Sequence, residues 1–166
     1  MPKVTSATPD ADGLAVAIAV ARFNHYITSR LLEGAIEAFL DKGGSENDLH
    51  VVHVPGAFEL PLAAKKLASS KKYAAVVCLG AVIRGDTPHF EYVCAETARG
   101  IMDASRKTDV PVAFGVLTTD TTEQALARIS PRSNKGADAM LAALEMANVM
   151  KQLSGKGKVA KKRRKR

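Results

Sequence analysis

The stretch AAVVCLGAVIRGDTPHF, residues 74–90, contains the change of pattern that decides the fold. Residues 74–83 form a continuous apolar run with several β-branched side chains, which is typical of a strand buried on both faces. Gly85 allows the chain to turn closely. Thr87 followed by Pro88 predicts a helix N-cap with proline at the first helical position. The stretch therefore predicts a buried parallel strand, a short polar loop and the start of a helix.

The loop between this strand and this helix has features of an anion site. Free backbone N–H groups and the positive end of the helix dipole attract phosphate at a helix N-terminus. His89 lies in the first helical turn, and an imidazole, with its ordinary pKa of about 6.5, suits proton transfer at neutral pH. Taken alone, the segment is equally consistent with a surface histidine beside a helix cap.

Strand-like and helix-like periods alternate along the rest of the chain. The predicted strands are 14–20, 49–54, 74–83 and 110–117, and the predicted helices are 29–41, 57–70, 88–107, 121–129 and 134–153. Strands separated by helices of this length imply parallel pairing through right-handed crossovers. The pattern predicts an α/β fold, a flavodoxin-like three-layer sandwich with a mainly parallel sheet of four to five strands and helices on both faces.

Length and charge distribution predict how the chain is divided. Its 166 residues, 46% of them hydrophobic, suffice for one domain with a sizeable core. We expect this domain over residues 14–153, a flexible N-terminal segment over 1–13 and a disordered basic tail over 154–166. The net charge of +7 comes from the tail, because residues 156–166 contain eight Lys or Arg and no acid.

The basic tail has two interpretations. Its end, KKRRKR at residues 161–166, could bind RNA, DNA or an acidic partner weakly through electrostatic attraction. It could equally be a solvated segment that keeps the protein soluble, because a basic hexamer carries no specificity by itself.

The sequence also bears on location and on redox state. No apolar run approaches the roughly 20 residues of a membrane span, and residues 1–13 lack the plan of a secretory signal. We therefore expect a cytoplasmic protein. Cys78 and Cys94 form neither a disulfide framework nor a metal-binding spacing, so we expect two reduced core thiols and no metal site.

Polar and aromatic residues follow each predicted strand, where ligands bind in open α/β sheets. Phe23 follows the first strand, Glu59 the second, the loop at residues 85–89 the third, and Thr-Thr-Asp at 118–120 the fourth. Together they predict an aromatic face, a carboxylate, a phosphate-binding loop and a proton-transfer residue at one edge. Alternatively, Phe23 packs in the core, and Glu59 only complements a helix dipole.

Six segments in order carry a resemblance to a known family. They are ARFN at 21–24, VPGAFELP at 54–61, GAVIRGDTPHFEYV at 80–93, PVAFGVLT at 111–118, EQALAR at 123–128 and NKG at 134–136. Over residues 14–153 the chain resembles the 6,7-dimethyl-8-ribityllumazine synthases of riboflavin biosynthesis. The resemblance implies condensation of 5-amino-6-(D-ribitylamino)uracil with 3,4-dihydroxy-2-butanone 4-phosphate. Phosphate and water are released, and neither a metal nor an organic cofactor takes part.

The resemblance also implies roles for single residues. Those implied to bind the ribitylaminouracil are Phe23, Ala57, Phe58, Glu59, Ala81, Val82, Ile83 and Phe114. Phe23 would stack on the pyrimidine ring. Asp86 and Thr87 would offer N–H groups to the phosphate of the second substrate, and Arg128 would hold that phosphate with its planar guanidinium.

His89 is the implied catalytic residue, because imine formation, phosphate elimination and ring closure each require proton transfer. Asp138 lies where members of the family often have a carboxylate that orients this histidine. Asp86 departs from the family pattern, because many members have a small or neutral residue at this position. An acid beside a phosphate must point away or weaken binding. Pro131 is a second departure and will stiffen a segment that is commonly rich in glycine.

Members of this family are homo-oligomers built from pentamers with sites between subunits. The resemblance implies that Phe114 and Arg128 come from the neighbour of the chain that supplies Phe23 and His89. A free pentamer, a decamer and a 60-subunit shell all remain open. Two other classes also remain open: a flavin-precursor binding module, which would not need His89 together with Arg128, and a shell-forming structural protein with a polyanion-binding tail.

Overall fold

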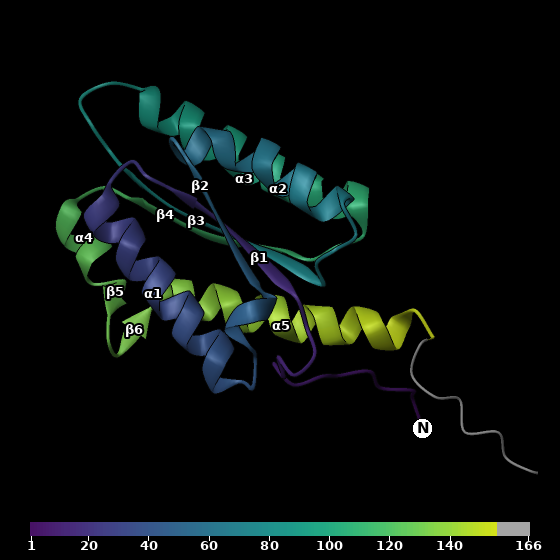
Figure 1. Ribbon diagram of the computed structural model, residues 1–166. Coiled ribbons are helices and arrows are strands. Elements are labelled where there is room, and N and C mark those ends of the chain that lie inside the picture. Colours follow the sequence, from purple (N-terminus) through teal and green to yellow (C-terminus); the bar gives the residue numbers. More distant parts are fainter. Residues whose placement is uncertain (156–166) are drawn as a thin grey trace, which may run out of the picture.

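The computed structural model describes residues 1–155. Figure 1 shows a three-layer arrangement in which α2 and α3 cover one face of the sheet and α1 and α5 cover the other. The four parallel strands are β1 (Val16–Ala21), β2 (Leu49–Val54), β3 (Ala75–Ile83) and β4 (Val112–Thr119), in the spatial order β2-β1-β3-β4. This confirms the predicted α/β three-layer fold with a parallel sheet.

The helices connect the strands as the alternating periods predicted. They are α1 (His25–Asp41), α2 (Leu60–Ser69), α3 (His89–Thr108), α4 (Thr122–Leu126) and α5 (Lys135–Leu153). Two short 3₁₀ turns, η1 (Glu46–Asp48) and η2 (Ala57–Glu59), flank β2, and a hairpin of β5 (Ile129–Ser130) and β6 (Ser133–Asn134) precedes α5.

The sequence of β1, VAIAVA, explains the two different layers of the core. Its larger side chains, Val16, Ile18 and Val20, pack in the cluster that contains Leu31, Phe39, Met140 and Leu144 of α1 and α5. Its three alanines pack against α2 and α3, in a cluster that also contains Ala57, Ala64, Ala68 and Ala104. Alternation along β1 thus points its larger side chains to one face of the sheet and its alanines to the other.

The packing of α1 against α5 depends on a close contact between Gly136 and the backbone of α1. A Cβ atom added to Gly136 would lie only 2.0 Å from the carbonyl oxygen of Leu31. The side chain of Asn134 caps α5, since its Oδ1 accepts hydrogen bonds from the N–H groups of Gly136 (2.8 Å) and Ala137 (3.1 Å). Its Nδ2 donates to the carbonyl of Arg30 on α1 (2.9 Å). Asn134 and Gly136 therefore join the two helices.

Several element boundaries differ from the predicted ones. Helix α1 begins at His25, four residues before the predicted start, because Asn24 adopts the left-handed conformation (φ 58°) and turns the chain directly after β1. The predicted helix 57–70 is divided into η2 and α2, with a proline in the first turn of α2. The predicted helix 121–129 ends at Leu126, and the hairpin that follows was not predicted.

The N-terminal segment lies along α5. The amide of Asn148 donates to the carbonyls of Thr8 (3.1 Å) and Asp10 (2.8 Å), and that of Gln152 donates to the carbonyl of Ser6 (2.8 Å). The flexibility of residues 1–13 remains a prediction. Residues 156–166, which contain the basic charges of the predicted tail, lie outside the described residues. Up to residue 155, every helix is too short or too polar to cross a bilayer.

Candidate active site

A hollow of about 730 Å³ opens at the carboxyl ends of β1, β2 and β3. The residues that line it come from these strand ends, from η2 and from the start of α3: Phe23, Pro55, Gly56, Ala57, Phe58, Glu59, Ala81, Val82, Ile83, Gly85, Thr87, His89, Phe90, Tyr92 and Val93. Most are apolar, and Glu59, Thr87 and His89 contribute the polar side chains. The hollow thus brings together nine of the residues that the sequence predicted, in the place expected for this sheet.

The end of β3 forms one side of the hollow and is fixed by Asn24. The Nδ2 atom of Asn24 donates a 2.8 Å hydrogen bond to the carbonyl of Ala81. This contact joins the N-cap residue of α1 to the last part of β3 and occupies one acceptor position on that carbonyl. Val82 and Ile83 are partly buried. We therefore expect a ligand at this edge to meet a rigid strand end.

The turn η2 forms the opposite side. The buried Thr97 of α3 donates from its hydroxyl to the carbonyl of Ala57 (3.3 Å), which anchors the turn from below. Gly56 leaves room for the neighbouring carboxylate, because a Cβ atom there would lie 3.2 Å from Oε2 of Glu59. A side chain at residue 56 would press on Glu59, whose carboxylate is available at the mouth of the hollow.

Two aromatic rings stand at the edge of the hollow with most of their surface in solvent. Phe23 is 71% exposed and Phe58 is 59% exposed. The alternative that Phe23 packs in the core is therefore wrong. An exposed aromatic ring in a largely apolar hollow offers a stacking face to a planar ligand.

The loop before α3 differs slightly from the prediction. The helix begins at His89, with Pro88 as its N-cap residue, so it starts one residue later than expected. The N–H of His89 donates to the hydroxyl of Thr87 through a long hydrogen bond of 3.5 Å. Gly85 does not have a positive φ, and a Cβ atom there would meet nothing within 4 Å. The fold of the subunit therefore does not require glycine at residue 85.

Arg84 is a residue whose role sequence reasoning missed. Its Nε donates to Oδ1 of Asp120 (2.8 Å), its Nη1 donates to the carboxylate of Glu91, and its guanidinium lies over the ring of Phe90, 4.3 Å from the ring centre. One indication of these ion pairs was present in the sequence: a cation follows the predicted third strand, an acid follows the fourth, and another acid lies in the first turn of the helix between them.

The contact with Arg84 makes part of the stability depend on pH. The hydrogen bond from Arg84 lowers the pKa of Glu91 from its ordinary value. A carboxylate with a lowered pKa stabilises the folded state fully when the pH is above the pKa of an unfolded glutamate, about 4.3. This stabilisation is lost as the pH falls through the lower pKa of the folded state. We therefore expect wild type to melt above Glu91→Gln at neutral pH, with the difference disappearing in acid. Thermal melting from about pH 7 to about pH 3 checks this. A difference that does not change with pH would contradict it.

Four residues named from the resemblance do not line the hollow. Phe114 is the third residue of the edge strand β4 and is 45% exposed. Arg128 follows α4, is exposed, and donates from Nη1 to the carbonyl of Gln124 (2.8 Å). Asp86 is exposed and does not line the hollow. Asp138 forms an ion pair with Lys135 (2.9 Å) in the first turn of α5. Within one subunit, these four do not join His89.

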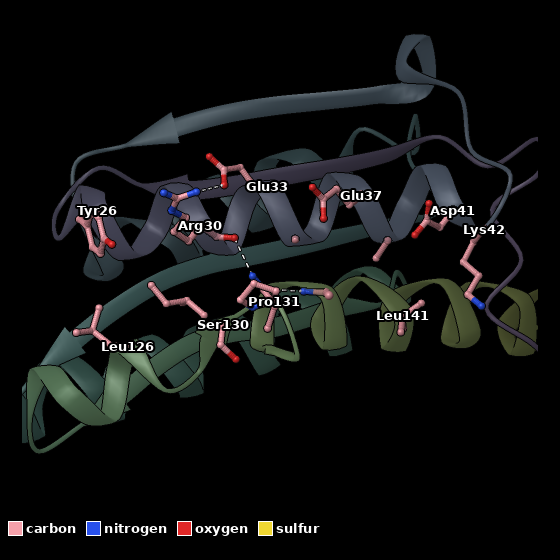
Figure 2. A pocket seen from close by; sticks show the side chains of 15 residues that line it. Tyr26, Arg30, Glu33, Glu37, Asp41, Lys42, Leu126, Ser130, Pro131 and Leu141 are labelled. Atoms are coloured by element: carbon pink, nitrogen blue, oxygen red, sulfur yellow. Dashed lines mark hydrogen bonds and ion pairs between the residues drawn. The ribbon is translucent and has the colours of Figure 1, made fainter.

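A second hollow of about 920 Å³ lies between α1 and the segment that joins α4 to α5 (Figure 2). Pro131, one of the two departures from the family pattern, lies at its edge with Ser130. The hydrogen bond from Asn134 to the Arg30 carbonyl crosses it, and the ion pair of Arg30 with Glu33 (3.0 Å) lies along α1. None of the residues predicted to bind substrate lines this hollow.

The two cysteines are free thiols in the described part of the chain. Burial raises the pKa of Cys78 to about 12, and burial also raises the pKa of the partly buried Cys94. Both therefore stay protonated at neutral pH and are poor nucleophiles. Residues 1–155 contain no group of three or more His, Cys, Asp or Glu side chains arranged to hold a metal ion.

Comparisons with known proteins agree with the geometry. The model of a family described as 6,7-dimethyl-8-ribityllumazine synthase matches residues 13–151. A protein of Syntrophus aciditrophicus (strain SB), named 6,7-dimethyl-8-ribityllumazine synthase, is 56% identical over 154 residues. The similarity covers 92% of this chain and 100% of the relative. The matched part of the chain includes every residue that lines the hollow, and also Phe114 and Arg128.

Proposed function

This chain belongs to the 6,7-dimethyl-8-ribityllumazine synthase family, and we propose that it forms its product in the hollow at the carboxyl ends of β1, β2 and β3. Its role is therefore the synthesis of 6,7-dimethyl-8-ribityllumazine in riboflavin biosynthesis. One observation carries the placement of the site: a single hollow gathers an exposed aromatic ring, a carboxylate and a histidine at a helix N-terminus.

The hollow is suited to the ribitylaminouracil. The exposed ring of Phe23 offers a face on which the pyrimidine can stack. The carboxylate of Glu59 can accept hydrogen bonds from ring N–H groups or from the ribityl hydroxyls. The backbone of residues 81–83 forms the side against which the ring would lie. The apolar walls bury the ring while these polar groups fix its orientation.

The start of α3 is suited to the butanone phosphate. This helix has 20 residues, and its first turn carries N–H groups without helical partners. The phosphate would lie near Thr87, with the exposed side chain of Asp86 pointing away from it. His89 would then stand between the phosphate and the ring of the other substrate, where it can transfer protons during imine formation, phosphate elimination and ring closure.

Wild-type protein mixed with both substrates should form lumazine, seen as a rise of lumazine absorbance and fluorescence. The proposal fails if a well-folded oligomer forms no product, and the flavin-precursor binding module would then be favoured.

We further propose that the complete site is shared between neighbouring subunits of a pentamer in the cytoplasm. Support comes from the position of Phe114 and Arg128, which are exposed and lie outside the hollow of their own subunit. A guanidinium is the group best suited to hold a phosphate through paired hydrogen bonds. The basic segment 156–166 would bind polyanions weakly and in a salt-dependent way.

A mixture of two inactive variants tests the shared site. His89→Ala and Arg128→Ala should each form product slowly. In a mixed ring, some interfaces are complete. At these, an Arg128→Ala subunit supplies His89 and its His89→Ala neighbour supplies Arg128. Refolding the two variants together at equal amounts should therefore restore about one quarter of the wild-type sites.

The control mixes wild type with the double variant His89→Ala, Arg128→Ala, and it should give a similar fraction of complete interfaces. Product formation is measured by absorbance at equal total protein. If the two single variants stay as slow together as they are apart, while the control mixture is active, each site lies within one subunit and the shared arrangement is wrong.

A further inference from the structure

Arg84 connects three elements that meet beside the hollow. Its backbone N–H donates to the carbonyl of Thr119 at the end of β4 (2.9 Å). Its guanidinium donates to Asp120, the next residue, and to Glu91 in the first turn of α3. The same guanidinium covers the ring of Phe90, whose side chain lines the hollow next to His89. One side chain thus links the end of the sheet to the turn that carries His89.

The first turn of α3 has little capping of its own. The N-cap residue Pro88 makes no side-chain capping bond, and the hydrogen bond between His89 and Thr87 is long at 3.5 Å. A proline N-cap also lacks an N–H group that could anchor the turn. The contacts of Arg84 with Glu91 and Phe90 are therefore well placed to decide where this turn stands relative to the sheet.

The chemistry of the guanidinium suits this task. Its planar fork can serve two carboxylates on different elements at the same time, which the ammonium of lysine does with far less geometric definition. Each of these partly exposed ion pairs contributes little stability by itself. The side chain of Arg84 is 42% exposed, and those of Glu91 and Asp120 are 54% and 63% exposed. We therefore expect the three contacts to affect orientation more than the free energy of unfolding.

We propose that Arg84 is a positioning residue that sets His89 and Phe90 against the end of the sheet, in the reaction assigned above to this hollow. The proposal rests on that function. Arg84 does not line the hollow itself, so it acts through the first turn of α3. If the turn shifts, the imidazole moves away from the reacting atoms, and a displacement of about 1 Å can lower a rate by about 10²-fold.

Arg84→Met tests the role of the fork, because methionine keeps an unbranched apolar stem over Phe90 and removes all five donors. We expect kcat to fall by about 10- to 100-fold with a smaller change in KM, since an interaction needed in the transition state is lost. Arg84→Lys, which keeps the charge, should lie between wild type and Arg84→Met. The thermal melting temperature should fall only slightly, as for Glu91→Gln at neutral pH, because these exposed ion pairs contribute little stability.

A double-mutant cycle separates positioning from a general structural effect. If Arg84 acts through His89, adding Arg84→Met to His89→Ala should lower kcat by less than about 3-fold, because the residue to be positioned is already absent. Arg99→Met is the matched control. Arg99 is another exposed arginine of α3, with an ion pair to Glu96 in its own helix, and its loss should leave kcat unchanged.

Two results would overturn the proposal: an unchanged kcat in Arg84→Met, or an equal loss of kcat in the wild-type and His89→Ala backgrounds. If Arg84→Met does not fold, the same cycle is carried out with Glu91→Gln and with Asp120→Asn. Each of these variants removes one of the two ion pairs of Arg84, and the same two results would overturn the proposal. Failure of the proposed function has a different signature, because wild type would then form no lumazine at all. A fully active His89→Ala would instead contradict the catalytic assignment.

Discussion

Replacement of His89 by alanine is expected to lower kcat by about 10²- to 10⁴-fold, the usual contribution of general acid–base catalysis. His89 is exposed, lines the hollow and stands in the first turn of α3. The assigned reaction requires protons to be moved at several steps, and one imidazole can serve them in turn. Steady-state lumazine formation at saturating concentrations of both substrates measures the effect.

Some turnover should remain in this variant. Holding two substrates in register accelerates their reaction without any proton transfer by the protein, and Phe23 and Glu59 are unchanged. KM for the ribitylaminouracil should therefore change little. The loss should appear mainly in kcat, which separates the loss of a proton-transfer group from the loss of a binding contact.

His53→Ala is the matched control for this experiment. His53 is an exposed histidine near the end of β2, and it does not line the hollow. An exposed substitution of this kind usually changes stability by less than about 0.5 kcal/mol, and kcat should remain that of wild type. If His89→Ala retains wild-type kcat as well, His89 is not the proton-transfer residue.

Replacement of Gly136 by alanine is expected to destabilise the fold by about 3 kcal/mol, the upper part of the range for overpacked sites. The added Cβ atom would stand 2.0 Å from the oxygen and 2.7 Å from the carbon of the Leu31 carbonyl. These are backbone atoms in the interior of α1, so they cannot move aside as the end of a flexible side chain can. The two helices would have to separate.

Thermal melting measures this effect. For a domain of this size, about 3 kcal/mol corresponds to a decrease of about 6–12 °C in Tm. The comparison is made at one protein concentration, because association makes Tm depend on concentration. Gly85→Ala is the control for stability. A Cβ atom at residue 85 meets nothing within 4 Å, so its Tm should equal or slightly exceed that of wild type.

If Gly136→Ala melts with wild type, α1 and α5 can separate at little cost. The close contact between the two helices would then not explain why residue 136 is glycine.

The strands were predictable because short apolar runs rich in β-branched residues, bounded by turn residues and helical periods, are plain in the sequence. The predicted strand 49–54 has the bounds of β2, and the predicted strand 74–83 differs from β3 by one residue. The start of α1 was not predictable. It depends on the left-handed conformation of Asn24, whose side chain bonds to Ala81, 57 residues further along the chain. The hairpin of β5 and β6 is too short to show a period.

The position of the hollow was predictable because parallel strands bring their carboxyl ends to one edge. Phe23, Glu59 and His89 therefore meet, although 66 positions separate the first from the last. The role of Arg84 was not predictable from its neighbours, since its partner Asp120 is 36 residues away. The places of Phe114 and Arg128 beside a neighbouring subunit came only from the family resemblance.

The alternation of large and small side chains along β1 also determines which mutations the core beside this strand can accumulate. On the α2 and α3 side, where the alanines of β1 pack, shortening a side chain removes few atoms, whereas enlarging one overpacks the layer. On the α1 and α5 side, shortening Phe39 or Leu31 leaves a cavity. Sequence drift should therefore favour small residues on the first side and large residues on the second.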